Sequence, residues 1–273
     1  MRGLWLPLVL LAGIAALTLA VRVLEPYLAF FPSAGETETP RNFGMDYAPL
    51  TIRTADGEQL HAWQLTAAHP RARIIYFHGN GGNLSVWAPI VTRLAHEGYS
   101  VLAFDYRGYG RSTGRPTERG LYRDVEAVVG QTWTSEDRSS PLVYWGRSLG
   151  ATMAAYAATV RKPDGIVLES GFPDARSVVR TSPVLLCVSV FSSYRFPTTE
   201  FLARDSSPLL IMHGDRDRVI PYSLGQALFD RARNPKKFLT IVGADHNDAA
   251  PPDERAYWRT VEQFTSSLRS TTM

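Results

Sequence analysis

One serine in the chain stands in a pattern that fits a catalytic nucleophile. Ser148 is the centre of "GRSLG" (146–150), which follows an apolar run and leads into a helix-prone, Ala-rich run. A serine on a sharp strand-to-helix turn exposes its hydroxyl, and glycines two residues to either side let the strand and the helix pack closely. The free N–H groups at the start of the helix would favour negative charge that develops beside the serine. The alternative is a small residue that only caps the helix.

A serine hydroxyl is a poor nucleophile without a base and a group that orients the base. Of the six histidines, His246 is the best placed, since it lies in the polar loop "GADHND" directly after the last apolar run. Two acids, Asp215 and Asp217, lie in "HGDRDRVIP" after the preceding apolar run. The chain order serine, aspartate, histidine is one that serine hydrolases use on a doubly wound sheet. The spacing leaves Asp215 and Asp217 as alternatives for the acid.

A Gly-rich loop supplies the second half of a candidate oxyanion hole. Acyl transfer through a tetrahedral intermediate needs two N–H groups set toward the developing charge. We expect these to be the backbone amides of Leu149, next to the serine, and of Asn80 in "HGNGGN" (78–83). The alternative for this loop is a phosphate cradle, but it lacks the G-x-G-x-x-G spacing and the Lys-Ser/Thr ending of a P-loop. No His, Cys or carboxylate cluster has metal-ligand spacing, so we expect no metal.

Eight β-type runs alternate with helix-prone segments and predict the scaffold that positions these residues. The first two runs flank a turn at 55–57 and predict an antiparallel hairpin. The other six are near-continuous apolar runs, typical of strands buried on both faces of a parallel sheet, so we predict a doubly wound α/β fold. The expected strands are 50–54, 59–66, 72–78, 99–105, 141–146, 165–170, 208–213 and 238–242. The expected helices lie near 85–97, 117–133, 148–161, 222–233 and 253–268.

The connection at about residues 171–207 is longer than a plain crossover requires. Its apolar residues run from Val178 to Phe201 and include the single cysteine, Cys187, which we interpret as a small buried hydrophobe. The segment is predicted to be either a small cap beside the site or an elaborated crossover helix that fills the core. A cap would cover the carboxyl ends of the strands, where ligands bind in such sheets.

The N-terminus predicts a membrane anchor. No charged residue occurs from Gly3 to Val21, and the run is long enough to approach the ~30 Å of a hydrocarbon core at ~1.5 Å per residue. The alternative is a cleavable signal peptide with its site at 18–20. Arg2 and the free amine favour an N-terminus on the inside, and hence an extracytoplasmic catalytic domain.

Composition and charge bound the remaining possibilities. The chain has 273 residues, 45% of them hydrophobic and 20% charged, which describes an ordinary globular domain plus an appendage. We expect an anchor over 1–24, a linker over 25–48 and one catalytic domain over 49–273. The net charge of +3 comes from scattered basic residues, which indicates a solvated surface rather than nucleic-acid binding.

The motifs together resemble the α/β-hydrolase superfamily. Within it the chain is similar to the membrane-anchored serine hydrolases that include the α/β-hydrolase-domain-containing lipid hydrolases, the depalmitoylases and their bacterial homologues. The resemblance implies an α/β-hydrolase fold with a mostly parallel, eight-stranded sheet and a small helical cap. It also implies that Asp217, the fifth residue of the His-Gly-x-x-Asp pattern, is the acid, while Asp215 falls on a variable position. The matching segments are 76–83, 104–127, 146–150, 213–221 and 243–248.

The expected function is therefore serine hydrolysis of a carboxylic ester or thioester, with Ser148, His246 and Asp217 as the triad. Water completes the reaction, so no cofactor is implied. The anchor and the apolar insertion favour acyl or lipid-like substrates near a membrane. Two alternatives stay open: a serine peptidase resembling an aminopeptidase, and a catalytically silent hydrolase fold that serves as a membrane scaffold.

Overall fold

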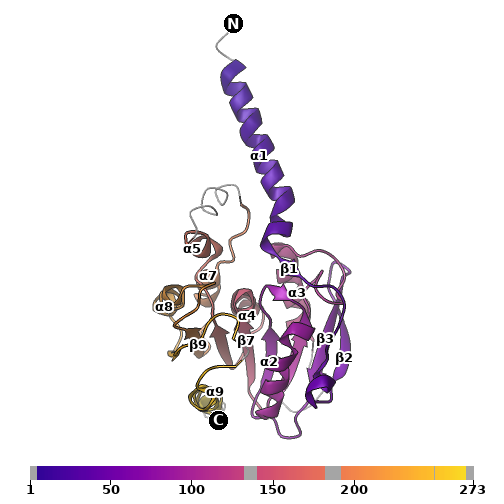
Figure 1. Cartoon of the computed structure of the whole chain (residues 1–273), viewed down its shortest axis with the longest axis vertical. Coiled ribbons are helices and arrows are strands. Elements are labelled where there is room, and N and C mark those ends of the chain that lie inside the picture. The colour runs from indigo at the N-terminus through magenta and orange to yellow at the C-terminus, as the bar shows by residue number, and fades with distance from the viewer. Residues whose placement is uncertain (1–4, 132–139, 182–191, 249, 269–273) are drawn as a thin grey trace.

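An eight-stranded sheet forms the centre of the molecule (Figure 1). The computed structural model describes residues 5–131, 140–181, 192–248 and 250–268. The strands lie in the order β10-β9-β8-β7-β4-β6-β3-β2. Their bounds are β2 Ala48–Arg53, β3 Gln59–Leu65, β4 Arg73–Phe77, β6 Ser100–Phe104, β7 Leu142–Arg147, β8 Gly165–Glu169, β9 Leu209–Gly214 and β10 Lys236–Ile241.

The predicted strand pattern is confirmed. β2 and β3 form the antiparallel hairpin, β3 pairs antiparallel with β6, and the pairs from β6 to β10 are parallel. Strands β6, β7, β8 and β9 are buried along their whole length, which explains their continuous apolar runs. The sheet is the mostly parallel, doubly wound sheet that the sequence predicts.

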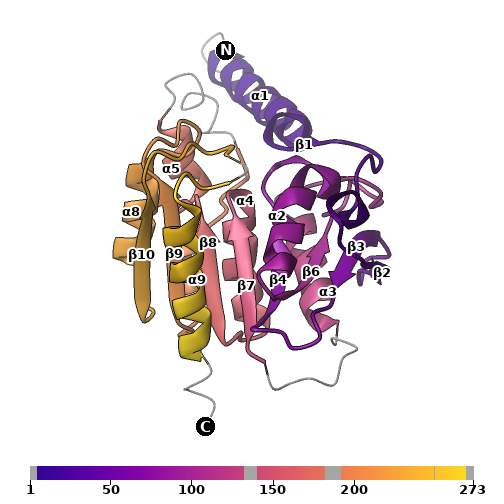
Figure 2. The ribbon, with the colours of Figure 1, turned by 60° about the horizontal axis from the view of Figure 1, so that its bottom comes forward.

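Helices cover both faces of the sheet (Figure 2). On β7, Tyr144 packs into the core shared with α3 and α4, whereas Val143 and Trp145 point into the core shared with α2 and α9. This alternation follows from the two-residue period of a strand. The helices are α1 Trp5–Ala29, η1 Pro40–Phe43, α2 Leu84–His96, α3 Glu118–Gly130, α4 Leu149–Val160, α5 Ala175–Val179, α7 Thr198–Leu202, α8 Tyr222–Arg231 and α9 Glu254–Leu268.

The long connection after β8 has short helices joined by loops where the structure describes it. It contains α5 and α7, and α7 packs on α4 through a 2.7 Å hydrogen bond between the hydroxyls of Thr152 and Thr198. Phe201 of α7 is buried against the rings of Tyr122 and Tyr156. Residues 182–191, which include the predicted buried Cys187, lie outside the described residues.

The apolar helix α1 stands away from the sheet (Figure 1). Its segment Pro7–Ala29 has a mean hydropathy of 2.2 and is long and apolar enough to cross a membrane. The helix continues to Ala29, past residue 24 where the sequence places the end of the anchor. The following segment, predicted as a linker, pairs with the body, because β1 (Phe31–Pro32) runs parallel to β5 (Gly81–Gly82).

A buried ion-pair cluster ties the β6–α3 loop to its neighbours. The guanidinium of Arg107 lies 2.8 Å from Asp124 on α3 and 2.9 Å from Asp56 in the β2–β3 turn. The backbone N–H of Arg107 also donates to Asp124, whose side chain is completely buried. The loop that precedes α3 is thereby attached both to that helix and to the hairpin.

We expect Asp124→Ala to lower the free energy of unfolding by about 3 kcal/mol, the lower end for a broken buried pair, because the buried Arg107 loses its fully buried partner and keeps only Asp56. Urea unfolding of the full chain in detergent micelles measures the change. Glu126→Ala, on the exposed side of the same helix, is the matched control and should cost well under half as much. Equal losses in the two variants would contradict this account of the cluster.

Candidate active site

The backbone turns sharply at Ser148, between β7 and α4. Its φ of 55° lies in the left-handed region that non-glycine residues rarely adopt. A Cβ on Gly146 would lie 2.0 Å from the carbonyl oxygen of Gly150, and one on Gly150 would lie 1.9 Å from that of Phe77. Both glycines are therefore required by close backbone packing, and the turn presents the Ser148 hydroxyl beyond the end of β7.

The structure brings Ser148, His246 and Asp217 together in one hydrogen-bonded chain. The Nε2 atom of His246 lies 3.1 Å from Ser148 Oγ, and its Nδ1 atom lies 2.7 Å from Asp217 Oδ2. The three residues come from the ends of β7, β9 and β10, and each is nearly buried. The Ser148 hydroxyl can thus pass its proton to imidazole, while the carboxylate fixes the imidazole tautomer.

The environment of Asp217 keeps it ionised. Burial on its own raises the pKa of the carboxyl, but hydrogen bonds outweigh this effect and hold the pKa well below its usual range. The donors include His246, His213 at 3.3 Å and the backbone N–H of Ile220 at 2.7 Å. A charged carboxylate at this position would stabilise an imidazolium on His246.

The other nearby acids point elsewhere. Asp215 is exposed and accepts a 2.6 Å hydrogen bond from the backbone N–H of Gly243. Asp245 pairs with the guanidinium of Arg218. The structure therefore places Asp217, and not Asp215, against His246, in agreement with the position that the motif implies.

The two candidate oxyanion donors lie on segments that pack together. A Cβ on Gly150 would lie 2.6 Å from the carbonyl oxygen of His78, so the Gly-rich loop begins against the turn that carries Leu149. The backbone N–H groups of Leu149 and Asn80 donate to no group in the part of the chain that the structure describes. Both amides are free to bind an anionic oxygen.

A buried histidine–aspartate pair lies at the start of the Gly-rich loop. The Nε2 atom of His78 is 3.6 Å from Asp105, and both side chains are almost fully buried. Burial lowers the pKa of His78 to about 4 and raises that of Asp105 to about 7. The ring of His78 is fully buried and its Nδ1 atom lies 2.7 Å from the carbonyl oxygen of Gly79, so His78 is not a candidate base. Within the described ranges, no group of three or more His, Cys, Asp or Glu residues is arranged to hold a metal ion.

Arg147 is a site residue that the sequence reasoning missed. Its buried guanidinium donates to the carbonyl oxygens of His246 (2.7 Å) and Asp248 (2.9 Å), and so holds the loop that carries the imidazole. Its charge faces Glu169 at 3.8 Å, and Glu169 accepts a hydrogen bond from Tyr257. The only signal in the sequence is a charged residue at the end of an otherwise apolar strand.

Comparison with known proteins decides the family. The Hydrolase_4 family model, described as serine aminopeptidase, S33, matches residues 68–207, more than half of the chain. The chain is an α/β hydrolase. This hydrolase belongs to the superfamily that its motifs resemble, and its mostly parallel sheet is the sheet of that fold.

The relatives of this hydrolase include membrane and hydrolase proteins. An uncharacterized membrane protein of Saccharomyces cerevisiae is 29% identical over 273 residues, which cover 93% of this chain and 94% of the relative. Alpha/beta hydrolase domain-containing protein 17B of Homo sapiens is 29% identical over 226 residues, 78% of this chain and 73% of the relative. An esterase of Pyrococcus furiosus shares the fold with a TM-score of 0.67 at 20% identity, covering 89% of this chain and 97% of the esterase.

We expect Arg147→Met to destabilise the protein by about 3–5 kcal/mol, because the Glu169 carboxylate then stays buried without its cation. Thermal unfolding in micelles measures the loss. The double variant Arg147→Met/Glu169→Gln removes both charges and should recover part of the stability. A single variant as stable as the wild type would contradict the proposed pairing of these two charges.

Proposed function

We propose that this hydrolase cleaves carboxylic esters or thioesters through an acyl-enzyme formed on Ser148. The observation that carries the proposal is the hydrogen-bonded chain of Ser148, His246 and Asp217, with distances of 3.1 and 2.7 Å. This order and geometry activate a serine hydroxyl in unrelated serine hydrolases. The free backbone amides of Leu149 and Asn80 support the same chemistry, because they are available to bind a tetrahedral oxyanion.

The proposed reaction has two halves. Ser148 Oγ attacks the acyl carbonyl and gives its proton to Nε2 of His246, and the oxyanion is held by the two backbone amides. The imidazolium then protonates the departing alkoxide or thiolate, which leaves an acyl-serine. Water attacks that ester with His246 as the base, and the collapse of the second intermediate restores the serine hydroxyl. Asp217 keeps its charge throughout and orients Nδ1–H.

We propose that α1 is a single-pass anchor and that the substrates are acyl or lipid-like. The side-chain N–H of Asn80, in the Gly-rich loop, donates to the carbonyl oxygen of Ala29 at 2.7 Å. The end of α1 therefore adjoins the loop proposed to bind the oxyanion, and an anchored site would lie close to the membrane surface. With the N-terminus inside, the catalytic domain is extracytoplasmic.

The competing function is that of a serine peptidase, and the description of the matching family as serine aminopeptidases favours it. The same triad can attack an amide, so the triad itself does not distinguish the two substrate classes. The two substrate classes differ in the leaving group, so substrates that differ only in the leaving group distinguish an esterase from a peptidase.

We expect the full chain in detergent micelles to hydrolyse p-nitrophenyl acyl esters faster than aminoacyl p-nitroanilides. Activity should rise as the acyl chain lengthens beyond short chains, because a longer apolar chain buries more surface. Ser148→Ala should lower kcat by a factor on the order of 10⁴–10⁶. Preference for the anilides would establish the peptidase instead, and unchanged ester hydrolysis by Ser148→Ala would overturn the proposed nucleophile.

We expect Asp217→Asn to lower kcat by roughly 10⁴-fold, because the neutral amide favours the wrong imidazole tautomer. Asp215→Asn is the matched control two residues away, and its kcat should stay within about twofold of the wild type, because Asp215 is exposed and its carboxylate accepts from the backbone N–H of Gly243 rather than from His246. Steady-state ester hydrolysis measures both variants. A larger loss in the Asp215 variant would exchange the roles assigned to the two acids.

A further inference from the structure

The segment from Ala29 to Glu36, here called the strap, lies along the outside of the Gly-rich loop. β1 pairs parallel with β5, with Phe31 opposite Gly81 and Pro32 opposite Gly82. The N–H of Ser33 donates to the carbonyl oxygen of Gly82 at 2.9 Å. A pair of two-residue strands is not stable alone, so the strap keeps this position only if both of its ends are fixed.

The side chain of Asn80 is held by two groups outside its own loop. Its amide N–H donates to Ala29 at the start of the strap (2.7 Å), and its Oδ1 accepts from the hydroxyl of Tyr109 (2.9 Å). The same hydroxyl lies 2.9 Å from the Asn80 carbonyl oxygen. The side chain and the carbonyl are thus engaged in structural contacts, and the backbone N–H is left for a ligand.

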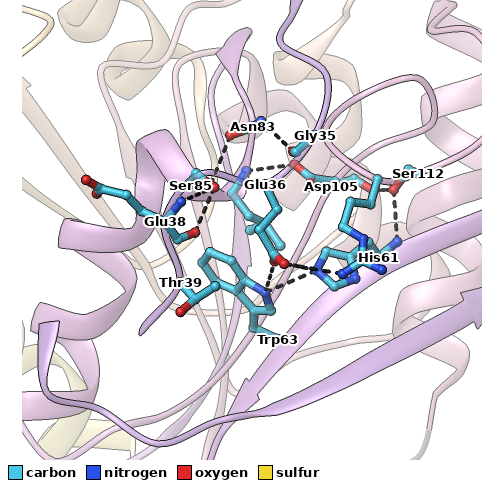
Figure 3. Close-up of polar contacts among 12 residues, drawn as sticks. Gly35, Glu36, Glu38, Thr39, His61, Trp63, Asn83, Ser85, Asp105 and Ser112 are labelled. Atoms are coloured by element: carbon cyan, nitrogen blue, oxygen red, sulfur yellow. Dashed lines mark hydrogen bonds and ion pairs between the residues drawn. The ribbon is translucent and has the colours of Figure 1, made fainter. Parts of the chain in front are cut away.

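The far end of the strap is fixed by Glu36 (Figure 3). Its carboxylate lies 2.8 Å from Nε2 of His61 and 3.0 Å from the indole nitrogen of Trp63, on β3. The N–H of Thr37, just beyond the strap, donates to the hydroxyl of Ser85 at the start of α2. Asn83, also in Figure 3, donates from its side chain to two strap carbonyl oxygens.

The near end is fixed beside the anchor. Phe30 is only 3% exposed, and its ring packs at 5.5 Å from Tyr194 and 6.2 Å from Phe196, both in the long connection after β8. Glu25, in the last turns of α1, accepts hydrogen bonds from Ser193. The strap is therefore stretched between the anchor helix and β3, with the loop of Asn80 against its middle.

We propose that the strap is a positioning element of the active site, which holds the Asn80 backbone N–H at the place where the oxyanion forms and so makes the membrane-exit segment part of the catalytic machinery. The inference rests on the proposed function, since it assumes the oxyanion role of Asn80. A donor helps only if it is preset, so loosening the strap weakens binding of the transition state more than binding of the substrate. The loss then falls on kcat and leaves KM nearly unchanged.

The test uses the full chain in micelles and a short p-nitrophenyl ester, with kcat expressed per site labelled by a fluorophosphonate so that unfolded protein is not counted. Glu36→Ala should lower kcat about ten- to hundredfold and leave KM within about twofold. This loss is smaller than the ~10²–10³-fold loss in kcat expected when one oxyanion donor is removed completely. Asn80→Ala keeps the backbone N–H of residue 80 but removes the side-chain hydrogen bond to the carbonyl oxygen of Ala29, so its kcat and KM should change in the same way. Glu38→Ala is the matched control, because the Glu38 side chain is exposed, and it should retain wild-type kcat.

A second readout separates positioning from a general structural effect. The inhibition constant of an acyl trifluoromethyl ketone, which forms a tetrahedral oxyanion on the serine, should rise by the same factor as kcat falls. If Glu36→Ala does not fold, Ser85→Ala removes the acceptor beyond the strap and should give a smaller loss of the same kind. The inference would be overturned if Asn80→Ala, together with Glu36→Ala or Ser85→Ala, kept the wild-type kcat and inhibition constant. Ester hydrolysis by Ser148→Ala would instead overturn the proposed function.

Discussion

The rest of the site depends on one backbone constraint, the sharp turn at Ser148. A residue with φ of 55° is strained by roughly 1–3 kcal/mol, and the surrounding structure must impose it. Close packing imposes this conformation, because α4 starts so close to β4 and β7 that neither Gly146 nor Gly150 has room for a Cβ. The same turn that presents the hydroxyl leaves the N–H of Leu149 at the first position of the helix, where helix geometry provides no partner.

Two consecutive residues of the turn also connect it to the neighbouring loops. The N–H of Ser148 donates to the carbonyl oxygen of Glu169 at the end of β8, and the side chain of Arg147 donates to the carbonyl oxygen of His246. The proposed nucleophile and the proposed base are therefore both positioned from one short segment. Its buried cation is balanced by the carboxylate of Glu169, which makes the arrangement sensitive to removal of either charge.

The strands and the polar loops after them were predictable because each depends on a local pattern. Continuous apolar runs marked β4 and β6 to β9, and parallel topology then placed the ends of β7, β9 and β10 at one edge. The spacing could not choose between Asp215 and Asp217, because that choice depends on where each side chain points. The strap was interpreted as a linker for a similar reason. Most of its contacts are made by backbone groups, and those of Glu36 reach β3, 25 residues away.

The central claim is that Ser148 forms the covalent bond with the substrate, and the location of a covalent adduct tests it most directly. Trypsin cleavage after Arg147 and Arg161 releases the peptide 148–161, with Ser148 as its first residue. Full-length protein in micelles, treated with a fluorophosphonate and analysed by peptide mass spectrometry, should carry the added mass on Ser148. An adduct on another residue, or no adduct in a preparation that hydrolyses esters, would contradict the account.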